Sequence, residues 1–282
     1  MLVEKITSRQ NPLVKRFRRV RAGSERHHIF LEGVRLIEDA LAAGVRFETV
    51  AFTSSVESND RGLRLLDQLQ KIPCRGAHVP PQVMQAIADT ESPQGIAAIV
   101  SRPFYELADL FADRPTLLVI ADGLQDPGNL GTIIRTAEAA NVNGLVTTRD
   151  TVDPFNQKAL RASMGSALRL PVVADADRAD VAQWCRTHNV ALIGTRTSPL
   201  RKPVMIEDAA RAEKTRAYTD ADLTVPLAFL LGREATGLAE ATDADQFVYI
   251  PMSPQIESLN VSAAAAILLY EAARQRQFIN LK

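Results

Sequence analysis

Cysteine, aromatic residues and long apolar runs are all scarce in this chain. Its 282 residues include only two cysteines, Cys74 and Cys185, and 5% are aromatic. The cysteines lie far apart, which argues against a disulfide-rich scaffold and gives no metal-ligand spacing. No apolar run approaches the roughly 20 residues that cross a bilayer, and the first residues lack the apolar segment of a signal peptide. We therefore expect a reducing, cytoplasmic location, with no membrane and no metal as partners.

The chain also lacks a net charge, but its charges are unevenly placed. Basic and acidic residues number 33 each. Residues 1–21 hold seven basic residues and one acidic residue, so this segment carries +6 and the remainder −6. A basic segment on an acidic body indicates contact with a polyanion, because cations that neutralise phosphates release counterions. The solvated face of an amphipathic helix, with Leu13, Phe17 and Val20 turned inward, explains the same charges equally well.

The chain divides into two regions with different patterning. Residues 1–102 mix helical and strand-like segments, including a helical pattern over 33–43 and an apolar run over 47–52. The polar residues 103–115 predict a linker. From residue 116 to 282, near-continuous apolar runs alternate with helix-compatible stretches, which predicts a parallel sheet with helices on both faces. The apolar runs cover residues 117–121, 144–147, 170–174, 190–194, 226–231 and 247–250.

Three loops that follow these runs are rich in glycine, proline, asparagine and serine: residues 122–131, 232–237 and 251–262. Ligands of open parallel sheets bind at the carboxyl ends of the strands, so these loops are the candidate site. The first loop runs into a helix that carries Arg135, which places a cation beside exposed backbone N–H groups. It matches neither G-x-G-x-x-G nor G-x-x-x-x-G-K-[ST], which argues against a dinucleotide or nucleoside triphosphate site.

Each loop also has a purely structural explanation. An ion pair with Glu138 would account for Arg135, and Ser258 and Asn260 are natural helix caps that need no further role. Gly-x-Glu-x-x-Gly, over residues 232–237, is common at sharp turns between a strand and a helix. Three such loops at corresponding strand ends favour one shared site over three unrelated structural roles.

Together, the three loops resemble the motifs of the SpoU (TrmH) family of RNA ribose 2′-O-methyltransferases, within the SPOUT superfamily. The opening Thr7–Lys15 and the segment Phe30–Gly33 resemble the ribosomal-protein-like domain that often precedes this catalytic domain. The resemblance covers nearly the whole chain and is closest to the branch that modifies ribosomal RNA. The motif segments are Asp122–Ala137, Gly232–Gly237 and Ile250–Ser262, with Asn260 inside Ser-Leu-Asn-Val-Ser.

The resemblance implies an α/β fold in which residues 116–282 form a SPOUT-type parallel sheet with a C-terminal trefoil knot. A smaller α/β substrate-binding domain, residues 1–102, would precede it. The implied reaction is methyl transfer from S-adenosylmethionine to a ribose 2′-hydroxyl of structured RNA, with ribosomal RNA as the favoured substrate. The resemblance also implies that the enzyme is a homodimer. The cofactor would lie around Gly232, Ile250 and Leu259. The residues that match the family's functional positions are Asn129, Arg135, Glu234, Ser258 and Asn260. With RNA as the partner, the basic candidates for binding it are Arg9, Lys15, Arg16, Arg18 and Arg19.

Two departures from the family pattern stand in the motifs. Arg233 and Ala235 occupy places where the second motif more often has a small polar residue and a glycine, and Pro254 stands where many relatives have glycine. The first departure adds a charge and a Cβ beside the second loop.

Several alternatives stay open at this point. Methylation of transfer RNA fits the same residues, as does a catalytically silent RNA-binding protein of the same fold. Arg135 is either a base that loses its proton with the help of a phosphate, or a charge that stabilises the developing alkoxide. The guanidinium group gives up its proton reluctantly, which favours charge stabilisation.

Overall fold

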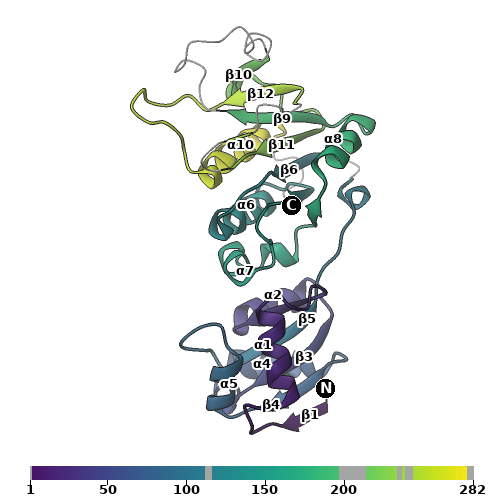
Figure 1. Ribbon diagram of the computed structural model, residues 1–282, viewed down its shortest axis with the longest axis vertical. Coiled ribbons are helices and arrows are strands. Elements are labelled where there is room, and N and C mark those ends of the chain that lie inside the picture. Colours follow the sequence, from purple (N-terminus) through teal and green to yellow (C-terminus); the bar gives the residue numbers. More distant parts are fainter. Residues whose placement is uncertain (1, 112–115, 197–213, 234–236, 239–243, 278–282) are drawn as a thin grey trace. The chain divides into compact units, whose positions relative to one another are not determined.

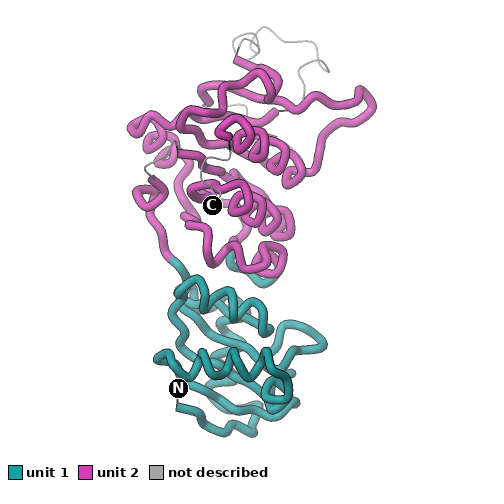
Figure 2. The backbone as a smooth tube through the Cα atoms, turned by 180° about the vertical axis from the view of Figure 1, so that it is seen from behind, with its two compact units in different colours: residues 1–103, 155–157 teal, residues 104–154, 158–282 magenta. Residues whose placement is uncertain are grey.

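The computed structural model describes residues 2–111, 116–196, 214–233, 237–238 and 244–277. The chain forms two compact units, shown in different colours in Figure 2. The first comprises Met1–Pro103 together with Phe155–Gln157, and the second comprises Phe104–Pro154 and Lys158–Lys282. Within the described ranges, no helix combines the length and the apolar character that a membrane span requires.

The first unit is a five-stranded mixed sheet covered by helices on both faces. Its strand order is β1-β4-β3-β5-β2, with β1, β4 and β3 parallel and β5 antiparallel to both β3 and β2. The strands are β1 (Leu2–Lys5), β2 (His28–Glu32), β3 (Phe47–Phe52), β4 (Arg75–His78) and β5 (Ile96–Ser101). The helices are α1 (Pro12–Arg21), α2 (Val34–Ala42), α3 (Ser54–Glu57), α4 (Asp60–Gln70) and α5 (Pro81–Ile87).

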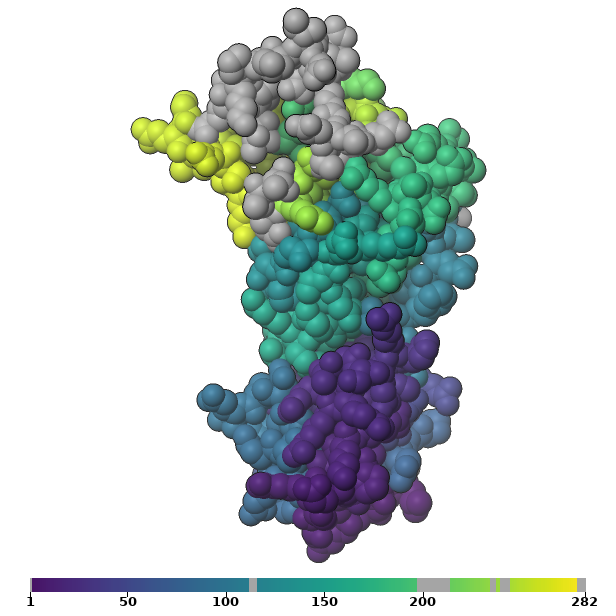
Figure 3. All heavy atoms as spheres, viewed as in Figure 1, coloured from purple at the N-terminus to yellow at the C-terminus, as the bar shows by residue number. Residues whose placement is uncertain are grey.

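Helix α1 is both a basic surface and a part of the hydrophobic core. It begins where the Asn11 side chain accepts a hydrogen bond from the N–H of Leu13 at 2.8 Å, and Pro12 follows in the first turn. The apolar side of α1, including Val14 and Phe17, is buried against α5 and the sheet. The other side lies on the surface of the first unit, where the N-terminal residues are purple in Figure 3.

The segment Phe30–Gly33 has a structural role in this unit. The Glu32 carboxylate accepts hydrogen bonds from the backbone N–H groups of Asp89 (2.7 Å) and Thr90 (3.2 Å). Gly33 precedes α2 with a φ of +97°, which favours glycine because a Cβ is strained there. The side chain of Gln94 then accepts from the N–H of Val34 at 3.1 Å. These contacts join the start of α2 to the loop before β5.

The second unit contains the predicted parallel sheet, which is confirmed. Its seven described strands lie in the order β10-β12-β9-β11-β6-β7-β8, and every neighbouring pair is parallel. Strand β11 lies between β6 and β9, so strands that are distant in sequence are neighbours (Figure 1). Because all of these strands are parallel, their carboxyl ends lie at the same edge of the sheet. The strands are β6 (Leu117–Ala121), β7 (Gly144–Thr148), β8 (Val172–Ala176), β9 (Ala191–Arg196), β10 (Thr215–Ala217), β11 (Leu227–Leu231) and β12 (Gln246–Tyr249).

Helices cover both faces of this sheet. On one face, α8 (Arg178–Thr187) buries Val181 and Cys185 against apolar side chains of β6, β9 and β11. Successive residues of a strand point to opposite faces, so every second residue of β6 faces away from α8. There α6 (Pro127–Ala139) and α10 (Val261–Gln275) pack side by side, and α7 (Gln157–Ser163) follows β7 (Figure 1). Single 3₁₀ turns lie at Leu107–Leu110, Ser166–Leu168 and Tyr218–Asp220.

The trefoil knot stays a prediction, because residues 234–236 and 239–243, between β11 and β12, lie outside the described residues. The described part of this segment does pass very close to the end of β11. A Cβ on the buried Gly232 would lie 2.3 Å from the carbonyl carbon of Gly237. Glycine is therefore required at position 232 for steric reasons.

Candidate active site

The three sequence motifs meet at the carboxyl-end edge of the second sheet. The N–H of Asp122, directly after β6, donates to the carbonyl of Leu231 at the end of β11 (2.8 Å). The first loop therefore begins beside Gly232, where the second loop begins. The third loop follows β12, on the same edge of this all-parallel sheet.

The first loop ends in a firmly capped helix, α6. Asp126 accepts the N–H of Asn129 at 2.7 Å, and Pro127 occupies the first turn. Lys158 forms an ion pair with the same carboxylate at 3.0 Å. The hydrogen bond from Lys158, together with that from the N–H of Asn129, holds the pKa of Asp126 below its usual value. The backbone that carries Asn129 is thus fixed by its own cap.

Asn260 joins the first motif to the third. Its Oδ1 accepts from the N–H groups of Ser262 (2.8 Å) and Ala263 (3.3 Å), which caps α10. Its Nδ2 donates to Oδ1 of Asn129 at 2.9 Å. One side chain therefore caps α10 and links it to the N-terminus of α6, across 131 residues of sequence. The N-termini of two helices, each the positive end of a helix dipole, are therefore linked by one hydrogen bond.

Arg135 does not make the ion pair that a purely structural role would require. Glu138 instead binds Arg169, with two hydrogen bonds of 2.6 and 2.9 Å. Arg135 is exposed, and among the described residues it has neither a hydrogen bond nor an ion pair. It lies six residues beyond Asn129, which is about 9 Å along the helix and about 120° around its axis. The two side chains therefore leave α6 in different directions.

The expected cofactor positions combine buried backbone with partly exposed apolar side chains. Gly232 is buried, and Ile250 and Leu259 are half-buried at the ends of the second and third motifs. Within the described residues, no hydrogen bond takes up the backbone N–H of Ile250 or of Leu259. Apolar walls with free backbone donors suit a ligand that has a purine ring and polar edges. These residues therefore fit S-adenosylmethionine.

The roles of two more expected functional residues, Glu234 and Ser258, stay predictions. Glu234 lies outside the described residues. Ser258 is exposed and, in the described part of the chain, makes no polar contact with Asn129, Arg135 or Asn260. Its role in the site stays a prediction.

The basic side chains of α1 differ in their contacts. The Arg16 guanidinium binds Glu25 at 3.2 Å and Glu48 at 2.7 Å, and all three side chains are mostly covered. Burial raises the pKa of Glu48, but hydrogen bonds from Arg16 and His28 outweigh it, so the pKa lies below its usual value. Arg16 therefore stabilises the first unit through these carboxylates.

Arg18 of α1, and Arg9, which precedes α1, both bind helix α5. Arg18 Nε donates to the carbonyl of Ala86 at 2.9 Å, and Arg9 Nε donates to the carbonyl of Gln82 at 3.1 Å. The carbonyl of Ala86 is one of the last in α5, and such carbonyls lack partners within the helix. Lys15 is exposed and Arg19, although it contacts Glu25 at 3.2 Å, has a 64% exposed side chain. Lys15 and Arg19 are thus the cations of α1 most accessible to a ligand.

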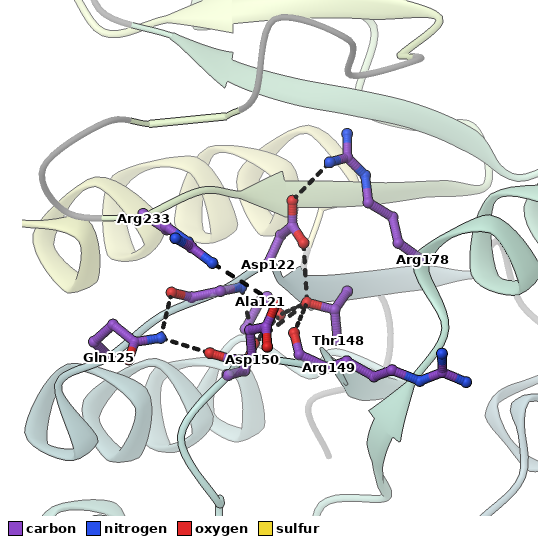
Figure 4. Close-up of polar contacts among 10 residues, drawn as sticks. Ala121, Asp122, Gln125, Thr148, Arg149, Asp150, Arg178 and Arg233 are labelled. Carbon is purple, nitrogen blue, oxygen red and sulfur yellow. Dashed lines mark hydrogen bonds and ion pairs between the residues drawn. The ribbon is translucent and has the colours of Figure 1, made fainter.

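A polar network behind the first loop was not predicted from the sequence (Figure 4). The Asp122 carboxylate accepts from Oγ1 of Thr148 at 2.9 Å and forms an ion pair with Arg178 at 3.2 Å. Gln125 donates to the carbonyls of Gly123 (3.0 Å) and Asp150 (2.5 Å). The network fastens the first loop to the segment after β7. Polar residues directly after β7 and β8 were the available signal, but their pairing depends on the strand order.

Among the residues that the structure describes, no cluster of histidine, cysteine, aspartate or glutamate could hold a metal ion. His27 and His188 lie in different units.

Comparison with known proteins assigns both units. Residues 116–270 match the model of the SpoU rRNA methylase family, and residues 4–98 match the MRM3-like substrate-binding domain. The chain is 34% identical to an uncharacterized tRNA/rRNA methyltransferase of Synechocystis, over 97% of this chain and 95% of that one. It is 31% identical to the 23S rRNA (guanosine(2553)-2′-O)-methyltransferase RlmP of Bacillus subtilis, over 95% and 98%. The AdoMet-bound rRNA methyltransferase from Sinorhizobium meliloti superimposes with a TM-score of 0.81 at 29% identity, over 96% and 98% of the two chains. The resemblance inferred from the three motifs is thus confirmed, and the chain belongs to the SpoU rRNA methylase family.

Proposed function

We propose that this protein transfers the methyl group of S-adenosylmethionine to the ribose 2′-hydroxyl of a nucleotide in ribosomal RNA. The observation that carries this proposal is the hydrogen bond between Asn129 and Asn260, which unites the first and third family motifs at one edge of the sheet. Membership of the SpoU family and the names of the relatives, which are rRNA methyltransferases, support it.

The reaction requires a ribose oxygen to be brought in line with a methyl group and to lose its proton. Bound S-adenosylmethionine supplies an electrophilic methyl carbon on a sulfonium. Gly232, Ile250 and Leu259 would hold it, through backbone groups and apolar side chains. Asn129 and Asn260 hold the neighbouring loops in one arrangement, and most of the rate gain comes from such positioning.

Arg135 supplies the charge. An arginine guanidinium stays protonated in proteins, so it stabilises negative charge on the ribose oxygen better than it removes a proton. Its exposed position, without an internal carboxylate partner among the described residues, leaves that charge available to substrate. Ser258 and Glu234 would orient the ribose and brace the second loop, respectively.

The test is methyl transfer with a chemical readout of the position. The purified chain is incubated with S-adenosylmethionine labelled in the methyl group and with ribosomal RNA, transfer RNA or neither. The RNA is then hydrolysed in alkali, which needs a free 2′-hydroxyl and therefore leaves a labelled dinucleotide at a 2′-O-methylated ribose. We expect that product from ribosomal RNA. Label in transfer RNA alone would redirect the substrate, and no label would indicate a silent RNA-binding protein.

We also propose that the two units divide the work. Residues 1–102 would bind RNA through α1, with Lys15 and Arg19 as its most accessible cations, and residues 116–282 would catalyse, with 103–115 as the linker. The match of residues 4–98 to a substrate-binding domain supports this division. An enzyme that modifies ribosomal RNA acts where ribosomes are made, and we propose the cytoplasm as its location.

A homodimer completes the proposal. Arg135 and Asn129 leave α6 in directions about 120° apart, so within one copy the two side chains point to different places. In a homodimer, Arg135 of one copy would reach a ribose that lies beside Asn129 of the other copy. Tyr270 of α10 and Ile256 before it are 46% and 49% exposed, which leaves apolar surface for such a contact. Analytical ultracentrifugation gives the mass. Mixing Arg135→Ala with a cofactor-site variant, Leu259→Asp, should restore activity if Arg135 acts across the dimer.

A further inference from the structure

Arg233, one of the residues that depart from the family pattern, has a fixed backbone. Its N–H donates to the carbonyl of Gly237 at 3.1 Å, and its own carbonyl accepts from the N–H of Gly237 at 2.8 Å. The preceding residue, Gly232, has no room for a side chain against the same segment. The direction in which the Arg233 side chain leaves the second loop is therefore set by the fold.

That side chain extends across the beginning of the first loop (Figure 4). A Cβ on Gly123 would lie 2.6 Å from Nε of Arg233, so this guanidinium covers the Cα of Gly123. The N–H of Gly123 is itself held by Oγ1 of Thr151 at 2.9 Å. Arg233 thus carries a cation from the second loop to the loop that ends at Asn129.

The anion that Arg233 contacts inside the protein is loosely held. Nη2 of Arg233 lies 3.8 Å from Oδ2 of Asp150, and their side chains are 53% and 78% exposed. The neighbouring carboxylates have closer arginines of their own: Arg178 lies 3.2 Å from Asp122, and Arg149 lies 3.0 Å from Asp177. Exposed pairs with long separations contribute little to stability. Arg233 can therefore exchange Asp150 for another anion at small cost.

The chemistry of the substrate supplies that anion. In an RNA chain the carbon beside the 2′-hydroxyl carries a phosphodiester, so a site that receives the hydroxyl also receives a phosphate. A guanidinium binds phosphate oxygens through two parallel, charge-assisted hydrogen bonds. We propose that Arg233 binds the RNA phosphate next to the methylated ribose, in place of its contact with Asp150. This inference rests on the proposed function.

The test compares the variant Arg233→Ser, in which a small polar side chain replaces the guanidinium, with the wild-type chain. RNA affinity is measured from low to high potassium chloride, cofactor affinity by calorimetry, and transfer kinetics with ribosomal RNA. Arg233→Ser should raise the KM for RNA about tenfold and reduce the slope of log affinity against log salt by about 0.7–0.9. It should leave kcat and the Kd for S-adenosylmethionine within about twofold.

Three companion variants sharpen the result. Arg233→Lys keeps the charge without the two-pronged geometry, so it should restore the salt slope and only part of the affinity. Asp150→Asn removes the competing carboxylate and should lower the KM for RNA about twofold. Arg186→Ser removes an exposed arginine at the far end of α8, and it should match the wild type in every measurement.

Two results would overturn the inference. A wild-type salt slope in Arg233→Ser, together with weaker cofactor binding, would show that Arg233 braces the cofactor loop. Wild-type values for both would show that it binds neither ligand. These outcomes are read only against a wild-type chain that methylates RNA, so they differ from failure of the proposed function, in which the wild-type chain itself transfers no methyl group.

Discussion

The arginines of α1 and those of the catalytic motifs look alike in sequence but have different surroundings. Arg16 lies between two carboxylates, and Arg18 donates to a carbonyl of α5. The Arg135 side chain, by contrast, is exposed and has no hydrogen bond or ion pair within the described ranges, and the Arg233 guanidinium lies 3.8 Å from the exposed carboxylate of Asp150. A run of basic residues can thus serve largely to hold a domain together, whereas single arginines in the catalytic motifs stay available to a ligand.

The physical reason is that α1 packs into the hydrophobic core of its own unit. Its apolar side carries Val14 and Phe17 into the core, so neighbouring arginines lie close to the end of α5 and to Glu25 and Glu48. Deleting residues 1–21 would remove that core together with the charge. Only point substitutions can therefore separate RNA binding from folding in this unit.

The largest expected effect belongs to Arg135 in the first catalytic motif. Arg135→Ala should lower methyl transfer more than tenfold, because it removes the charge that stabilises the ribose oxygen, while cofactor affinity stays nearly unchanged. Single-turnover transfer and calorimetry measure the two quantities. Lys15→Ala is the matched control from the basic segment and should leave the transfer step intact at saturating RNA. An equal loss of cofactor binding in Arg135→Ala would make Arg135 a scaffold residue.

The next effect separates the two tasks of Asn260. Asn260→Ala removes both the cap of α10 and the hydrogen bond to Asn129, so it should cost about 1 kcal/mol of unfolding free energy as well as activity. Asn260→Asp keeps an oxygen that can cap the helix but cannot donate to Asn129. It should retain stability in urea unfolding yet lose activity. If Asn260→Asp were fully active, the link between the two helices would have no role in the reaction.

A smaller effect is expected within α1. The double variant Lys15→Gln, Arg19→Gln should weaken RNA binding and reduce its salt slope by roughly 1.5, which is two phosphate contacts at about 0.7–0.9 each. Arg16→Gln should leave the slope unchanged and instead destabilise the first unit by up to about 1 kcal/mol, since Glu25 and Glu48 each lose one of their partners. Filter binding and thermal unfolding give the two readouts. The reverse pattern would place Arg16, rather than Lys15 and Arg19, on the RNA.

The smallest effect concerns pH. Lys158 and the cap hydrogen bond lower the pKa of Asp126 in the folded chain, so folding favours its charged form. This contribution is present above about pH 4, the ordinary value of aspartate, and it disappears as the pH falls through the lowered value. The free energy of unfolding, measured in urea, should therefore fall between pH 7 and about pH 3. It should fall less in Asp126→Asn than in the wild-type chain. An identical pH dependence in the variant would contradict this account.

Much of the second sheet could be predicted because its strands are buried on both faces. The runs 117–121 and 226–231 coincide with β6 and, within one residue, β11. In the first unit the apolar run 47–52 coincides with β3. The strand β4, Arg75–His78, escaped prediction because only a glycine and an alanine of it are buried, and β1 escaped because all four of its residues are exposed.

The site, like the fold, was predictable only where its signal lies within one stretch of sequence. Motif residues could be assigned to strand ends, since a strand followed by a glycine-rich loop is visible in one stretch of sequence. The partners of Asp122 and Arg233 could not be assigned, since Thr148, Arg178 and Asp150 come from other stretches.

The amino-acid sequence by itself determined the class of the two units, the three loops and the family to which they belong, because these follow from local patterns of apolar and loop-forming residues. Only the tertiary structure decided which arginines bind partners inside the protein and which can bind a ligand. The reason is that a side chain's partners are set by strand order and helix packing, which bring together residues as distant as Asn129 and Asn260.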